Sequence, residues 1–179
     1  TTEIYTLSLH DALPISDSLI FSQISMIHIQ TYIMHDDMFI PIADFQGMIK
    51  DRNYVPGSIE LQVDGKVIIA RNVWDYISDL WPYLLHGIEA LLDGQREWET
   101  YYPDQPISLA FKVIANNRVA ITIDYSEKKS AVCGKNELVD SMLSAADDFF
   151  SNLLRIDPDS ALDYQSTLGQ LNRLTQRRK

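Results

Sequence analysis

Two aspartates near the middle of the chain, Asp75 and Asp79, are four residues apart. On a helix, residues at this spacing share one face, which is the arrangement that a pair of carboxylates for proton transfer would use. No further group in the sequence converges on the pair to complete such a site. A solvated acidic patch is therefore the favoured interpretation of these two residues.

Histidine and cysteine side chains offer the other possible catalytic groups, namely His28, His35, His86 and Cys133. None of these residues belongs to a zinc-protease or serine-hydrolase motif, and the sequence contains no glycine-rich phosphate-binding motif. Cys133 lies in a short apolar segment and is expected to be packed core. We predict no metal site and no cofactor, and we keep an enzyme with a site around His28 and His86 as an alternative.

The stretch with the clearest binding chemistry is residues 97–104, which place three large aromatic side chains among three acids. Trp and Tyr anchor protein interfaces, and acidic residues around them attract a basic partner. An equally good interpretation is that Trp98 and Tyr101 close one end of the core, and a connector of this length can do both. The predicted protein-binding residues are Glu97, Trp98, Glu99, Tyr101, Tyr102 and Asp104, with Asp75 and Asp79 as a second acidic patch.

The charge distribution narrows the class of partner. Residues 17–172 hold 23 acidic and 11 basic side chains, a net charge of −12, whereas four basic residues lie in the last seven positions. Such an acidic body repels phosphate backbones, so no nucleic-acid partner is expected. The single cysteine rules out an internal disulfide and suits the reducing cytoplasm. Charged or polar residues interrupt every apolar stretch, so no membrane span is predicted.

Alternation of apolar and polar residues predicts most of the strands. A strand is expected over residues 26–34, and hairpins are expected over 59–69 and 107–125. Asp64-Gly65 and Asn116-Asn117 supply turn residues that tolerate positive φ. A short strand is predicted at 131–133, and residues 39–49 and 95–106 are interpreted as connectors.

Periodic apolar residues predict three helices. Asn72 is expected to cap a helix over 73–92 that ends at Gly94, with Pro82 kinking or dividing it after Leu80 or Trp81. Asn136 is expected to cap a second helix that runs to about residue 155. A C-terminal helix with a basic tail is expected over residues 155–179, with Asp157 as its N-cap and Pro158 as its first helical residue.

The order of these elements favours an α+β fold. Hairpins imply antiparallel pairing, and helices placed between them cover a sheet face. We therefore predict one domain over 17–179, with an antiparallel sheet of one strand and two hairpins packed on one face by two or three helices. A second alternative follows from the helix that carries Trp74 and Trp81. Its apolar stripe is broad enough to favour a structural or assembly subunit.

The first sixteen residues, TTEIYTLSLHDALPIS, resemble the in-frame translation of a common short-read sequencing adapter. This resemblance implies that residues 1–16 are an artefact that was never selected to fold. It also places the native start between Asp17 and Met38.

The rest of the chain resembles, in general character, small acidic bacterial immunity proteins. This resemblance implies a non-catalytic cytoplasmic protein that binds and neutralises a basic toxin domain.

Overall fold

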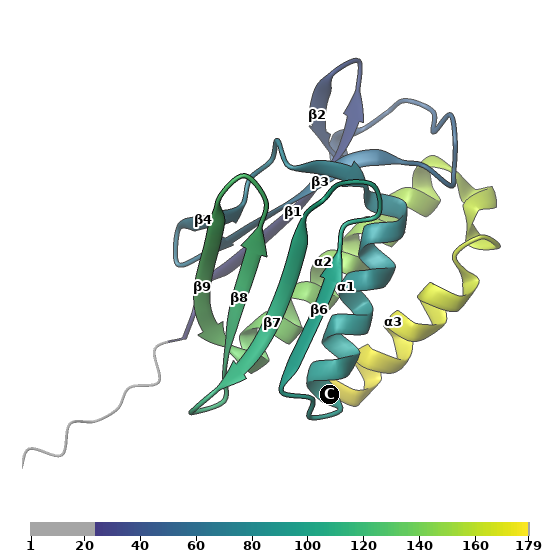
Figure 1. Ribbon diagram of the computed structural model, residues 1–179. Coiled ribbons are helices and arrows are strands. Elements are labelled where there is room, and N and C mark those ends of the chain that lie inside the picture. The colour runs from purple at the N-terminus through teal and green to yellow at the C-terminus, as the bar shows by residue number, and fades with distance from the viewer. Residues whose placement is uncertain (1–23, 179) are drawn as a thin grey trace, which may run out of the picture.

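Two antiparallel sheets and three α-helices make up residues 24–178, the part of the chain that the computed structural model describes (Figure 1). The α+β class predicted from the sequence is confirmed, and the strands form two sheets where a single one was expected. The adapter-like residues 1–16 lie outside the described range.

Sheet A is built from the N-terminal strands. Its strand order is β2-β1-β3-β4. Strand β5 pairs with the first residues of β3, on the same edge of β3 that pairs with β4 further along the strand. The strands are β1 (Ile27–His35), β2 (Met38–Pro41), β3 (Pro56–Val63), β4 (Lys66–Ile69) and β5 (Trp74–Tyr76). Between β2 and β3 lies a short 3-10 helix, η1 (Ile42–Asp44). The predicted first strand and first hairpin are confirmed, whereas β2 occupies part of a predicted connector.

Positive backbone angles explain why two of these turns form. Asp64 and Gly65 have φ values of 51° and 79°, as expected for the two-residue turn between β3 and β4. Asp36 and Asp37, at 48° and 60°, make a second turn of this kind between β1 and β2. Aspartate tolerates the left-handed region better than most residues do, so the sequence specifies both hairpins.

Sheet B has the order β6-β7-β8-β9, so its strands follow one another along the chain. They are β6 (Glu97–Tyr101), β7 (Ser108–Ile114), β8 (Arg118–Asp124) and β9 (Lys128–Gly134). The hairpin around Asn116-Asn117 is confirmed, with φ values of 60° and 54° at these residues. The interpretation of residues 95–106 as a connector was wrong for 97–101, which form β6.

The two sheets meet where β4 lies beside β9 (Figure 1). Lys66 on β4 donates from Nζ to the carbonyl oxygen of Ser130 on β9, at 2.8 Å. The inner faces of both sheets are apolar and contribute to one core. The strands of both sheets therefore pack around one continuous core.

Helix α1 (Ile77–Leu92) begins later than predicted, because residues 74–76 form β5. Asn72 therefore does not cap it, and the expected division at Pro82 does not occur. Pro82 lies in the second turn, where its missing N–H removes only one hydrogen bond of the helix. The predicted end is confirmed. Gly94, at φ 83°, allows the N–H groups of Gly94 and Gln95 to bond back to Leu91 and Ala90.

Helix α2 (Lys135–Ile156) packs on β1 and also reaches β8 and β9. Its N-cap is Gly134, not Asn136 as predicted. The chain then forms η2 (Pro158–Ala161), with Asp157 as N-cap, and α3 (Gln165–Arg178), which packs against α1 and α2 (Figure 1). Two cations of the basic tail are ion-paired within the fold, because Arg177 contacts Asp93 and Arg178 contacts Asp140.

The centre of the core lies between α1, α2 and the two sheets. Trp81 of α1 is fully buried, stacks on Phe149 with ring centroids 5.9 Å apart, and donates from Nε1 to Thr31 Oγ1 at 3.2 Å. Phe111 of β7 and Ile59 of β3 bring the two sheets into the same cluster. Within residues 24–178, no helix is long and apolar enough to cross a lipid bilayer.

Candidate functional site at the β6 edge

Within residues 24–178, strand β6 is an edge of sheet B and pairs only with β7. The hydrogen bonds that flank it join Val113 N–H to the Arg96 carbonyl and Tyr102 N–H to the Ile107 carbonyl. Backbone groups alternate in direction along an antiparallel strand. Those of Glu97, Glu99 and Tyr101 therefore point away from β7, so this strand has an unpaired edge of the kind that binds other chains.

One face of β6 is exposed and combines aromatic and acidic side chains. Tyr101 is 67% exposed, and Glu97 and Glu99 are exposed on the same face. The hydrogen bond and charge of Lys112 lower the pKa of Glu97 below its ordinary value. Asp104 is exposed in the connector that follows. We call Glu97, Glu99, Tyr101 and Asp104 the β6 surface.

The opposite face of β6 belongs to the core. Trp98 is half-buried against Phe111, with ring centroids 5.1 Å apart, and it fits against α1 because Gly87 has no side chain there. A Cβ at Gly87 would lie 2.8 Å from the Trp98 ring. Tyr102 is 4% exposed, and burial, followed by the charge of Asp75, raises its pKa. The structure thus buries Tyr102 in the core and turns Trp98 toward the core, where it is half-buried.

The structure does not bring Asp75 and Asp79 together as a surface patch. Asp75 lies on β5, is fully buried, and accepts hydrogen bonds from the N–H groups of Tyr76, Asp104 and Gln105. Its carboxylate therefore holds the connector between β6 and β7 against sheet A. Asp79 lies in the first turn of α1, where burial and then the charge of Asp75 raise its pKa.

The outer face of sheet B beside the β6 surface carries small side chains. The register places Ala110, Thr122 and Ser130 in one row beyond Glu99. Residues paired across neighbouring strands point to the same side of a sheet. The β6 surface therefore adjoins a row without large side chains, which a partner can approach closely.

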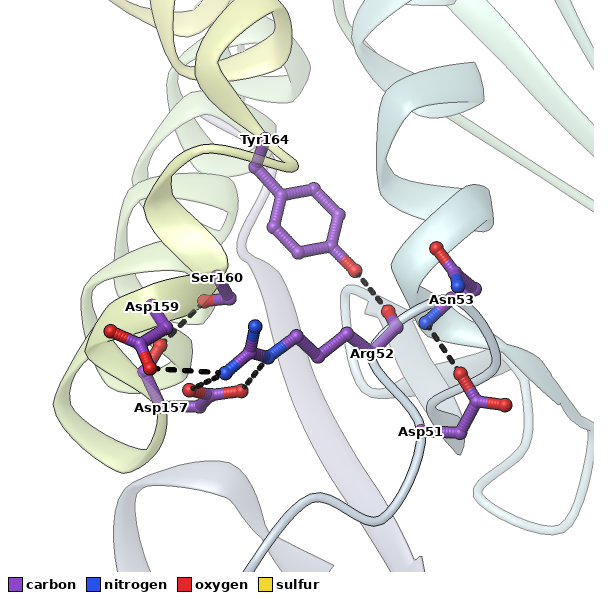
Figure 2. A network of polar contacts seen from close by, with 7 residues as sticks. All are labelled: Asp51, Arg52, Asn53, Asp157, Asp159, Ser160 and Tyr164. Atoms are coloured by element: carbon purple, nitrogen blue, oxygen red, sulfur yellow. Dashed lines mark hydrogen bonds and ion pairs between the residues drawn. The ribbon is translucent and has the colours of Figure 1, made fainter.

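A polar network holds the connector between η1 and β3 against η2 (Figure 2). Arg52 pairs with Asp157 through two nitrogen atoms, one of them 2.9 Å from Oδ1, and it also reaches Asp159. Tyr164 donates its hydroxyl to the Arg52 carbonyl at 2.7 Å, and burial raises the pKa of this phenol to about 12. Arg52 lines a hollow of about 590 Å³, but its charge is already neutralised within the fold.

The histidines do not form a site together. His28 is exposed on the outer face of sheet A, opposite Gln62, whereas α1 packs on the inner face and carries the exposed His86. His35 lies edge-on to Phe45 with ring centroids 5.5 Å apart, at the turn that contains Asp36. Within residues 24–178, no group of three or more His, Cys, Asp and Glu side chains is arranged to hold a metal ion.

Cys133 is buried on the inner face of sheet B, and burial, followed by the charge of Glu137, raises its thiol pKa to about 12. At pH 8 the folded protein should react with an aromatic disulfide reagent at least about a hundredfold more slowly than the protein in guanidinium chloride, because the thiolate is the reacting form. The absorbance of the released aromatic thiolate measures both rates. Equal rates would contradict the burial of this thiol.

The two tryptophans behind the assembly-subunit alternative are not on one helix. Trp81 is on α1 and is fully buried, whereas Trp74 is on β5, opposite Ser58. The broad apolar surface of α1 is covered because both sheets, α2 and α3 contact this helix. The breadth of this stripe therefore needs no second copy of the chain to explain it.

The segment that contains β6, predicted to be a connector, carries a strand signal in its sequence. Residues 97–102 alternate in the structure between exposed and inward-facing, and the order Glu-Trp-Glu-Thr-Tyr-Tyr contains that period. Nothing in the sequence pattern, by contrast, indicates that the Asp75 carboxylate accepts hydrogen bonds from residues about 30 positions away.

The fold and this site together define an α+β protein of two antiparallel sheets with an unpaired, acidic and aromatic edge strand. No protein-family model matches the chain, and no curated protein or solved structure matches it either.

Proposed function

We propose that this protein is a non-catalytic binding protein that recognises a basic protein domain through the β6 surface. The observation that carries the proposal is the 67% exposure of Tyr101 on an edge strand whose other face is anchored in the core. A large aromatic side chain held on a rigid strand loses little conformational freedom when it binds. Such residues account for much of the affinity of protein interfaces.

The charges of the β6 surface support a basic partner. Glu99 and Asp104 are exposed, and neither is ion-paired within residues 24–178, whereas Glu97 is already paired with Lys112. The surrounding body is acidic as well, with a net charge of −12 over residues 17–172. A field of one sign speeds the approach of an oppositely charged domain and sets its orientation.

The specific version of the proposal is an immunity protein that acts in the cytoplasm and neutralises a basic toxin domain. The size of the chain, its acidity and the lack of a catalytic motif in its sequence support this version. Blocking a toxin requires only a stable complex that covers the toxin's active region. An unpaired strand edge and an exposed aromatic anchor meet that requirement.

The experiment is affinity capture from the source organism, combined with sequencing of the neighbouring genes. We expect the captured protein to carry a basic C-terminal domain, to be encoded next to this gene, and to lose its toxicity when the two proteins are co-expressed. An operon of metabolic enzymes without a toxin gene would contradict the immunity version. An acidic captured partner would contradict the charge argument.

Substitutions on the β6 surface test the binding site itself. Tyr101→Ala should weaken binding of the captured basic domain by about thirtyfold, the effect of losing an aromatic hot spot. Glu99→Lys should mainly slow association and reduce the dependence of the rate on salt. Surface plasmon resonance at two ionic strengths measures both effects.

Asp44→Lys is the matched control, because Asp44 is an exposed acid on η1, outside the β6 surface. It makes the same charge change and should leave the affinity within about twofold of the wild type. The site assignment is wrong if Asp44→Lys weakens binding as much as Glu99→Lys does, or if Tyr101→Ala has no effect.

A further inference from the structure

The first half of β1 is a second unpaired strand edge. On one side β1 pairs with β3 from Ile27 to Ile33, but on the other side β2 pairs only with residues 32–35. Within residues 24–178, no strand lies beside Ile27 to Thr31 on that side. This edge is on sheet A and is independent of the β6 surface.

The backbone groups on this edge can be assigned from the strand register. The backbone N–H of Asp64 donates to the Met26 carbonyl, so the backbone groups of Met26 point toward β3. Every second residue after Met26 on β1 does the same. The N–H and carbonyl groups of Ile27 and Ile29 therefore point to the open side. Gln30 Nε2 already donates to the Thr31 carbonyl at 3.3 Å, which leaves Ile27 and Ile29 as the residues able to pair with an added strand.

Helix α2 forms the other wall of a groove along this edge. A hollow of about 520 Å³ lies between Ile27, His28 and Ile29 on β1 and one face of α2. The helical residues that line it are Asp140, Ser141, Ser144, Ala145 and Asp148. Ser141, Ser144 and Ala145 have short side chains, so an extended chain has room to approach the edge of β1. Ile27 and Ile29, which pack against the core, provide apolar contacts.

The charge of the α2 wall selects the occupant. Asp140 is paired with Arg178, whereas no cation within residues 24–178 is ion-paired with Asp148. A second copy of this acidic chain would bring further negative charge against these carboxylates, and a nucleic acid would do the same with its phosphates. A basic segment would instead gain charge-assisted contacts with Asp148.

We propose that the groove between β1 and α2 binds an extended, basic segment of a partner protein, which adds as a strand to Ile27–Ile29. Backbone hydrogen bonds to β1 supply binding that does not depend on side chains, and Asp148 supplies the preference for lysine or arginine. This site does not rest on the function proposed for the β6 surface.

The test uses the full-length protein and a capped seven-residue peptide in which lysine and valine alternate. Two matched peptides serve as controls, one with glutamate in place of lysine and one with N-methyl groups on alternate residues. Binding is followed by amide NMR shifts and hydrogen exchange. We expect the lysine peptide to shift and protect the amides of Ile27 and Ile29, and both control peptides to bind at least tenfold more weakly.

Variants of the protein separate this proposal from its alternatives. Asp148→Lys should weaken binding of the lysine peptide about tenfold. Asp44→Lys and Tyr101→Ala should leave it unchanged, because both residues lie outside the groove.

Three results would overturn the proposal. The first is equal binding of the N-methylated peptide, which would mean that no strand is added. The second is equal binding of the glutamate peptide. The third is protection of Ile27 and Ile29 that rises with protein concentration in the absence of peptide, which would make a second copy the occupant.

Discussion

Replacing Trp81 by alanine is expected to lower the free energy of unfolding by about 3–5 kcal/mol, the cost of removing a large aromatic side chain from a packed core. Trp81 is fully buried, stacks on Phe149 of α2, and reaches Thr31 of β1 with its indole nitrogen. One side chain thus joins α1, α2 and sheet A. A domain of this size is typically stable by about 5–15 kcal/mol, so the variant should retain little stability at 37 °C.

Urea denaturation followed by circular dichroism measures this loss, and two further variants separate its causes. Trp81→Phe keeps most of the ring stacking but removes the N–H donor, so it should cost about 1–3 kcal/mol. Trp74→Ala removes the same side chain from the outer face of sheet A, where Trp74 is only half-buried. Its cost should be clearly smaller. A Trp74→Ala variant that loses as much stability as Trp81→Ala would show that the centre of the core is assigned incorrectly.

Replacing Asp75 by asparagine is expected to cost about 2–4 kcal/mol, although the two side chains have nearly the same volume. The carboxylate accepts from the N–H groups of Tyr76, Asp104 and Gln105, at 2.6, 3.1 and 3.0 Å. An amide has one acceptor oxygen, and its NH₂ group would face the donors that the second carboxylate oxygen now satisfies. Buried donors without an acceptor are costly, and the hydrogen bonds lost here are charge-assisted.

Three measurements test the role of Asp75. Denaturation gives the loss of stability, and hydrogen exchange should be faster at the amides of Asp104 and Gln105. NMR titration of Asp79 provides an independent readout. The charge of Asp75 contributes to the raised pKa of Asp79, so its removal should move that pKa down toward the ordinary value. Asp79→Asn is the matched control and should change stability by no more than about 0.5 kcal/mol. An unchanged Asp79 pKa in Asp75→Asn would contradict the proximity of the two carboxyl groups.

Local sequence signals were sufficient where the structure depends on local turns. Asp64-Gly65 and Asn116-Asn117 predict their hairpins, because few other residues adopt positive φ readily. Gly94 predicts the end of α1 for the same reason. Residues 74–76 were predicted to be helical because their apolar spacing continues that of α1. They form β5 because they pair with β3, and that pairing is not encoded locally.

The candidate site could be predicted in composition but not in orientation. Residues 97–104 were correctly identified as unusually aromatic and acidic. Trp98 and Tyr101 were expected to close one end of the core, and this is right for Trp98 but wrong for Tyr101, which is 67% exposed. Binding of a partner by this segment stays a prediction. Trp98 and Tyr102 point inward, and Tyr101 points outward. Because successive residues of a strand point to opposite faces, recognising β6 as a strand would have separated these roles from the sequence.

The order of the strands along the chain also determines how this protein is assembled during synthesis. Sheet A is complete by Tyr76 and sheet B by Gly134, since no strand of one sheet is inserted into the other. Sheet B can therefore form from hairpins with short loops while the ribosome is still translating, whereas β1 of sheet A pairs with β3 across the segment that contains β2 and η1. Helix α2, which covers β1 from more than 100 residues away, is translated only after the strands of both sheets. The apolar face of β1 therefore stays without this cover until α2 emerges, and this interval is when the growing polypeptide most needs protection from aggregation.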